Sequence, residues 1–147
     1  MSRFAPARLS PDAYPHHVPV ETRFQDLDPL GHINNVAMAA LFEQARVRFN
    51  RQHLLPFGRH EQPHVRWLVA RVDVNYLAEA HFPDPVDMAS GIGRVGGSSW
   101  TMLSAGFQQG RCVALCDTVI VYTANGAPAA LPDALRSTLG SLAMLGR

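Results

Sequence analysis

The sequence predicts an α+β domain in which one antiparallel sheet packs against one long helix. Two observations support this. Residues 35–52 carry apolar side chains at 3.6-residue spacing, as in an amphipathic helix. Four runs between residues 67 and 123 then have strand-like patterns and are joined partly by short glycine-containing turns. With one strand before the helix, we expect a five-stranded antiparallel sheet with the helix on one face.

Composition limits the function classes that need to be considered. The chain has 147 residues, enough for one domain with its own core, and is 47% hydrophobic. Its formal net charge of +1 gives no strong positive potential that would attract nucleic acid, so we expect no nucleic-acid partner. No apolar run approaches the ~20 residues of a membrane span, and the N-terminus has no hydrophobic signal core, so we expect no membrane contact and a cytoplasmic location.

The N-terminal part is expected to be irregular. Residues 1–16 contain three prolines and no periodicity, which indicates an extended arm or a frayed end outside a single domain of residues 17–147. Residues 18–24 alternate and predict the first strand, which Pro19 places at an edge of the sheet.

The helix is the best-defined element. Its apolar stripe consists of Met38, Leu41, Phe42, Ala45 and Phe49, and it contains no internal glycine or proline. Asn34 is a suitable N-cap, because its side chain can accept a hydrogen bond from the first helical turn. Three breakers, Pro56, Gly58 and Pro63, indicate a loop over residues 53–66.

The remaining strands are predicted at residues 67–77, 86–95, 98–108 and 111–123, followed by a short helix over 133–145. Turns at Gly96-Gly97 and Gln109-Gly110 connect the last three strands. The last strand is apolar on both faces and is expected inside the sheet. Cys112 and Cys116 would share one face of it, roughly 13 Å apart, which is too far for a disulfide.

The chemistry-bearing residues gather between the first strand and the helix, in the string DLDPLGHINN. Asp26 and Asp28 lie in the expected turn, and His32, Asn34 and Asn35 lie where the helix should begin. The unpaired N–H groups of a helix start can stabilise a developing negative oxygen, while a carboxylate in the preceding turn supplies a nucleophile or a base.

This string resembles the signature of the hot-dog-fold acyl-CoA thioesterases of the 4-hydroxybenzoyl-CoA thioesterase type, Asp-x-Asp-x-x-Gly-His-(Val/Ile)-Asn-Asn, followed by Phe-Glu-x-Ala-Arg in the helix. Here the helix carries FEQAR. The order of elements also matches, so the resemblance covers about residues 18–123. It implies a five-stranded sheet wrapped around one long central helix, hydrolysis of acyl-CoA without a cofactor, and a homodimer that can double to a homotetramer.

The resemblance implies a catalytic role for Asp28, with Gly31, His32, Asn34 and Asn35 around the substrate and a polarising N–H near Asn35. An Asp-Pro pair can also simply form a turn through its side chain, and Asn34 and Asn35 can simply be caps. His32 can orient the carboxylate, contact substrate or hold the loop. For Asp26 we expect a structural role, bonding turn amides or an arginine such as Arg23.

Other residues define the alternatives. Glu43 could replace Asp28 as the catalytic acid, although a pair with Arg46 three residues on, or a place in a dimer interface, is the simpler role. His81 in AHFPDPV superficially resembles the His-Phe-Pro turn of hot-dog dehydratases, but no Pro-Gly follows, and we expect a loop histidine.

Asp117, in an apolar strand, needs an arginine partner or solvent. A non-catalytic acyl-thioester-binding protein is the third alternative. The histidines show no metal-site spacing.

Overall fold

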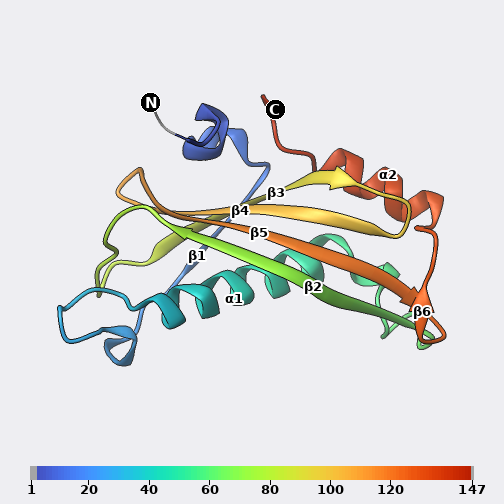
Figure 1. Cartoon of the computed structure of the whole chain (residues 1–147), viewed down its shortest axis with the longest axis horizontal. Helices are drawn as coiled ribbons and strands as arrows, with labels where there is room; N and C mark the ends of the chain where they lie inside the picture. The colour runs from blue at the N-terminus through green and yellow to red at the C-terminus, as the bar shows by residue number, and fades with distance from the viewer. Residues whose placement is uncertain (1–2, 147) are drawn as a thin grey trace.

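The computed structural model describes residues 3–146, in which a curled antiparallel sheet wraps around the long helix α1 (Asn35–His53) (Figure 1). The main strands are β1 (His16–Val20), β2 (Val65–Tyr76), β3 (Val86–Val95), β4 (Ser99–Gln108) and β5 (Arg111–Ala124). They lie in the order β1-β3-β4-β5-β2, and the two-residue β6 (Ala127–Pro128) pairs with β5. The predicted α+β architecture is therefore confirmed, with β1 at an edge and β5 inside the sheet.

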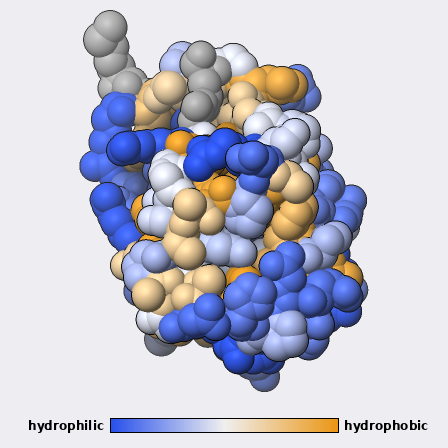
Figure 2. All heavy atoms as spheres, turned by 90° about the vertical axis from the view of Figure 1, so that its right-hand side faces the viewer, coloured by the Kyte–Doolittle hydropathy of each residue, from blue (hydrophilic) through white to orange (hydrophobic). Residues whose placement is uncertain are grey.

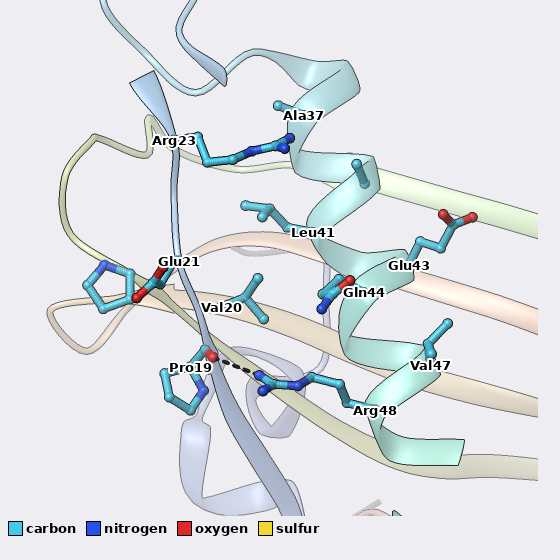
Figure 3. A pocket seen from close by; sticks show the side chains of 12 residues that line it. Pro19, Val20, Glu21, Arg23, Ala37, Leu41, Glu43, Gln44, Val47 and Arg48 are labelled. Carbon is cyan, nitrogen blue, oxygen red and sulfur yellow. Dashed lines mark hydrogen bonds between the residues drawn. The ribbon is translucent and has the colours of Figure 1, made fainter. Parts of the chain in front are cut away.

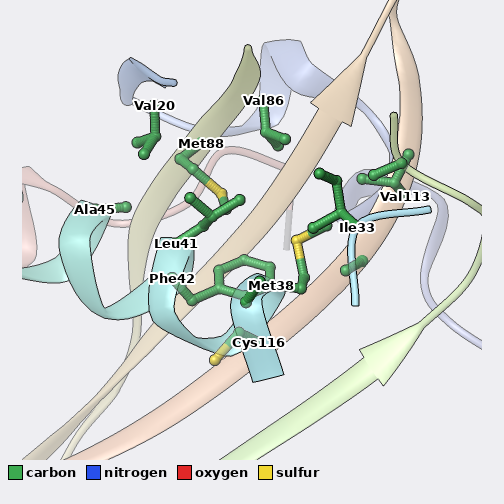
Figure 4. Packing of buried hydrophobic residues seen from close by; sticks show 13 residues of the cluster. Val20, Ile33, Met38, Leu41, Phe42, Ala45, Val86, Met88, Val113 and Cys116 are labelled. Atoms are coloured by element: carbon green, nitrogen blue, oxygen red, sulfur yellow. The ribbon is translucent and has the colours of Figure 1, made fainter. Parts of the chain in front are cut away.

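The helix forms where the sequence predicts it, for the predicted reasons. The Asn34 side-chain oxygen accepts a 2.7 Å hydrogen bond from the Ala37 N–H, which satisfies one free donor of the first turn. Every residue of the predicted apolar stripe is buried. Met38, Leu41 and Phe42 pack against Val86, Met88 and Cys116 of the sheet (Figure 4). This packing fixes the start of α1, and with it the preceding turn, against the sheet.

A second cluster continues this core toward the C-terminal end of α1. Phe49 and Leu54 pack there with Trp100 and Ile120, and the short helix α2 (Asp133–Ser141) adds Leu135 and Leu139. The predicted terminal helix is thus present but ends at Ser141. No helix among residues 3–146 is long and apolar enough to cross a membrane.

The N-terminal segment differs from the expected extended arm. It forms two short 3₁₀ helices, η1 (Pro6–Leu9) and η2 (Pro11–Ala13), and lies on the side of the sheet opposite α1 (Figure 1). Tyr14 packs there with Phe107 and Leu115, and the Arg8 guanidinium donates a 2.6 Å bond to Asp117. Prolines at the starts of η1 and η2 favour such short turns, and Arg8 is the arginine partner that Asp117 requires.

Two strand details also differ from expectation. The first strand runs from His16 only to Val20, and a 3₁₀ turn, η3 (Phe24–Asp26), replaces its predicted end. The β4–β5 register shifts where Phe107 pairs with Cys112 and Gly106 with Ala114, so Val113 is an extra residue in β5. This bulge reverses the alternation of side chains, and Cys112 packs on the outer face while Cys116 packs toward α1. The shared face predicted for the cysteines is wrong, although both are free thiols.

Candidate active site

The turn between β1 and α1 is closed by its own backbone. Leu27 and Ile33 form an antiparallel bridge, and the Asp28 N–H donates to the His32 carbonyl at 2.8 Å. The Gly31 N–H donates back to the Asp28 carbonyl at 3.0 Å. Gly31 has φ +80°, a left-handed conformation that a side chain would strain, so glycine is required here for the turn itself.

The Asp28 carboxylate is fixed by the same turn. Its Oδ1 accepts hydrogen bonds from the Leu30 N–H at 2.9 Å and the His32 N–H at 3.1 Å. This is the side-chain turn that an Asp-Pro pair can form, so the structural role considered for Asp28 is present. The carboxyl group is half-buried, and its Oδ2 has no hydrogen-bond partner among residues 3–146. One oxygen therefore holds the turn while the other remains available.

Asp26 is structural, as predicted. The side chain is 4% exposed, and its two oxygens accept from the Arg23 backbone N–H at 2.9 Å and the Arg23 guanidinium at 3.1 Å. Its carbonyl accepts from both the backbone and the side chain of Asn34. Asp26 therefore ties η3 to the start of the helix and has no free oxygen comparable to Oδ2 of Asp28.

Asn34 and Asn35 differ in which of their groups form hydrogen bonds. The Asn34 side chain is fully used, since its oxygen caps α1 and its amide donates to Asp26. Asn35 is the exposed first residue of α1, and its carbonyl accepts a 2.9 Å bond from the Tyr76 hydroxyl. Partial burial raises the pKa of Tyr76, so this hydroxyl keeps its proton. The N–H groups of the first turn beyond the cap have no intrahelical acceptor and point away from the helix.

His32 lies in a cluster that spacing along the chain does not reveal. The Ile33 N–H donates to the Ala80 carbonyl at 2.8 Å, and this bond brings the loop after β2 against the turn. Glu79 Oε2 lies 3.2 Å from His32 Nε2 and 3.9 Å from His81 Nε2. The two imidazole rings meet edge to face at 5.4 Å between centroids. Glu79 was not singled out from the sequence, because nothing local marks an exposed loop glutamate.

Large apolar side chains surround this end of the molecule. Phe24, Leu30 and Val36 are all more than 70% exposed, and Phe24 meets Phe82 edge to face. Exposed apolar groups beside a polar turn favour an apolar substrate or a partner surface.

The alternative acid, Glu43, is placed less favourably. Its side chain is 72% exposed and lies 3.8 Å from the Arg46 guanidinium, as expected for a pair three residues apart. It is the only acidic residue of α1, and the carboxylate beside His81 is Glu79 from the same loop. Among the described residues of one protomer, the carboxylate next to His81 is therefore Glu79 and not Glu43 of α1.

A groove of about 740 Å³ runs along α1 next to this site (Figure 3). Ala37 and Leu41 of the helix face Val20 of β1 across it, Arg23 lies at its upper end and Arg48 at its lower end. Arg48 donates to the Pro19 carbonyl at 3.3 Å. No group of three or more His, Cys, Asp or Glu side chains in the part of the chain described is arranged to hold a metal ion.

Comparisons with known proteins show the family and the fold of the chain. A family model described as the thioesterase-like superfamily matches residues 22–139. No curated protein matches the chain. A solved thioesterase from Thermus thermophilus, complexed with coenzyme A and Zn, is 34% identical, with TM-score 0.77 over 89% of this chain and 96% of that one.

Two further solved structures are similar. The PA5185 protein from Pseudomonas aeruginosa strain PAO1 is 29% identical, with TM-score 0.81 over 95% of this chain and 99% of that one. A thioesterase-superfamily protein from Jannaschia sp. CCS1 is 19% identical, with TM-score 0.80 over 91% of this chain and 96% of that one, and shows the fold alone.

Proposed function

The chain belongs to the thioesterase-like superfamily and has its hot-dog fold, and we propose that it is an acyl-CoA thioesterase that releases a carboxylic acid and free coenzyme A without a cofactor. One observation carries this proposal. The Asp28 carboxylate lies in the turn that precedes α1, with one oxygen bonded by turn amides and the other without a partner among residues 3–146. The Thermus protein, which is complexed with coenzyme A, supports CoA as the thioester carrier.

In the proposed reaction the first turn of α1 polarises the thioester. An N–H group near Asn35 donates to the carbonyl oxygen and stabilises the negative charge that develops there. Oδ2 of Asp28 then either attacks the carbonyl carbon, breaking the C–S bond to give an anhydride that water hydrolyses, or takes a proton from the water that attacks. In both routes the thiolate of coenzyme A leaves and is protonated.

The neighbouring residues hold the substrate against Asp28. Gly31 gives the turn its shape, Asn34 caps the helix whose amides do the polarising, and Asn35 is the exposed first residue of that helix. His32 contacts or orients the substrate through an imidazole that Glu79 holds at 3.2 Å. A carboxylate next to one imidazole nitrogen can orient the ring and leave its second nitrogen for the substrate.

We propose that the active form is a homodimer, which can double to a tetramer. β2 is an edge strand, and Leu68, Val69, Val72 and Tyr76 on it are each about half exposed. An unpaired strand with exposed apolar side chains favours pairing with a second copy of this chain. A cytoplasmic location remains our expectation.

The experiment that tests the proposal is a panel of acyl-CoA thioesters incubated with the protein and a thiol reagent. Release of free coenzyme A from at least one of them, lost in Asp28→Asn, is the expected result. A protein that binds acyl-CoA without releasing thiol would instead be a non-catalytic binding protein. Conversion of an enoyl or hydroxyacyl thioester with the C–S bond intact would indicate a dehydratase or hydratase.

A further inference from the structure

The capping of α1 leaves two backbone N–H groups of its first turn without an acceptor. The Ala37 N–H donates to the Asn34 side chain at 2.7 Å, and the Met38 N–H donates to the Asn34 carbonyl at 2.9 Å. The Asn34 N–H is also bonded, to a carbonyl of the preceding turn at 2.8 Å. The N–H groups of Asn35 and Val36 have no acceptor among residues 3–146. These two are therefore the donors that the first turn can offer to a substrate.

The Val36 N–H is held in place through the other end of its peptide group. The Tyr76 hydroxyl donates a 2.9 Å hydrogen bond to the Asn35 carbonyl. This carbonyl and the Val36 N–H belong to one planar peptide group, in which they point in opposite directions. A bond that fixes the carbonyl thus fixes the N–H as well. It also polarises the amide and makes the N–H a stronger donor, by about 10–30% for each bond in such a chain.

Tyr76 is suited to this task because its own backbone is fixed by the sheet. It is the last residue of β2 and pairs with buried Ala114, and the N–H groups of the two residues after it both donate to the Val113 carbonyl, at 2.9 and 3.2 Å. The Ala80 carbonyl then accepts the Ile33 N–H at 2.8 Å. The end of β2 therefore holds the start of α1 on both sides of the N-cap, with Tyr76 bonded directly after it.

The surroundings of this bond favour it once a substrate is bound. Phe24, Leu30 and Val36 expose apolar side chains at the end of the molecule that contains the turn. The opposite end, which contains the start of β2, is largely hydrophilic in its lower half (Figure 2). An acyl group that binds among the apolar side chains would exclude water from the half-exposed Tyr76 hydroxyl, and a hydrogen bond is stronger in such a setting.

Resting on the proposed thioesterase function, we propose that Tyr76 is a positioning residue that holds the Val36 N–H as a second donor to the thioester carbonyl, beside the Asn35 N–H. The two donors together stabilise the oxygen on which negative charge develops. Tyr76 touches neither the substrate nor Asp28 in this role, and no proton leaves its hydroxyl. It acts only through the peptide group that joins Asn35 to Val36.

Tyr76→Phe tests the proposal by removing one oxygen atom and keeping the ring. We expect kcat to fall about three- to tenfold while KM stays close to native, because the lost bond matters most when charge has developed on the carbonyl. Tyr122→Phe is the matched control, since the Tyr122 hydroxyl lies in the second core cluster and forms no hydrogen bond with residues 3–146. A native kcat in Tyr76→Phe, an equal loss in the control, or a loss that sedimentation traces to a changed assembly would each overturn the proposal.

The infrared stretch of the thioester carbonyl reports its polarisation directly. With a carbonyl-labelled acyl-CoA bound to Asp28→Asn, which prevents turnover, the stretch should lie at lower frequency than in water. Adding Tyr76→Phe should move it back toward the value in water, and adding Tyr122→Phe should not. An unchanged frequency in the Tyr76 variant would rule out its role even if kcat had fallen.

The amide resonance of Val36 tests the hydrogen bond without any ligand. Tyr76→Phe should shift this resonance upfield by more than those of the other amides of α1, and a Val36 resonance that does not move would overturn the proposal. If the native protein hydrolyses no acyl-CoA, the thioesterase proposal fails, and the positioning role in catalysis falls with it. If the native protein hydrolyses acyl-CoA and Tyr76→Phe does so equally well, the positioning role alone fails.

Discussion

Replacing Asp28 with Asn separates the two roles of this carboxylate, because asparagine can hold the turn but cannot act as nucleophile or base. The Leu30 and His32 amides now bonded to Oδ1 can donate to an amide oxygen in the same position. Bonds to a neutral acceptor are weaker by about 1 kcal/mol each, so two bonds limit the loss of unfolding free energy to roughly 2 kcal/mol. The half-buried position reduces it further.

Asp28→Asn is expected to change the rate of hydrolysis more than it changes the stability of the fold. Loss of a catalytic base or nucleophile commonly costs roughly 10²–10⁴-fold, which corresponds to about 2.7–5.4 kcal/mol of activation free energy. The assay is single-turnover release of coenzyme A at saturating acyl-CoA, with the folded fraction measured by circular dichroism. Near-native release by folded Asp28→Asn would refute the assignment.

Asp26→Asn is the matched control for this experiment. Asp26 is buried and its carboxylate is occupied by Arg23, so the exchange should cost stability, about 1–3 kcal/mol, while activity per folded molecule stays close to native. An inactive but folded Asp26→Asn beside an active Asp28→Asn would move the catalytic assignment two residues upstream.

The remaining predictions concern the surroundings of the site and the assembly. Glu43→Gln and Arg46→Ala should change melting temperature or assembly more than turnover; loss of turnover in Glu43→Gln at unchanged stability would place the catalytic acid in α1. Sedimentation at micromolar concentration should give a dimer, and a stable species of about 16 kDa would contradict the use of β2 as an interface. Glu79→Gln should lower kcat, because the imidazole of His32 loses the carboxylate 3.2 Å away that orients it; an unchanged kcat would make Glu79 a surface residue. Burial lowers the pKa of His16, which is bonded to His53 at 3.0 Å, so the folded form resists protonation. The contribution of neutral His16 to the free energy of unfolding should be present above about pH 6.5 and be lost as the pH falls through the pKa of His16 in the folded protein. Urea unfolding of His16→Gln should show a smaller loss of stability over this pH range.

Local pattern was enough for the helix and most strands. The stripe of α1 and its Asn34 cap depend on residues within one or two turns, so spacing alone predicts them. The edge position of β1 followed from Pro19 in the same way. No residue near Val113 in the sequence signals the bulge, because the bulge depends on how β4 and β5 pair. The placement of the arm on the sheet likewise depends on Arg8 meeting Asp117 across 109 residues.

The same distinction holds within the candidate site. The pairing of Asp26 with Arg23 joins neighbours in one turn and was expected. The approach of Glu79 to His32 requires the loop after β2 to bond to Ile33, which only the folded sheet brings about. Long-range contacts of this kind are set by topology, so a sequence motif marks the turn but not the residues that complete it.

For Asp28, the structural role and the proposed catalytic role support each other rather than compete. A carboxylate on a free side chain would rotate, and its reactive oxygen would reach a bound thioester only part of the time. Here two amides of the turn hold Oδ1, and the rigid carboxylate plane therefore fixes the direction of Oδ2 as well. The same turn ends at Asn34, which sets the first N–H groups of α1. In the proposed reaction, a single ten-residue stretch thus positions both the attacking oxygen and the polarising amides. Orientation, a large source of catalytic rate, would then come from ordinary turn and cap hydrogen bonds.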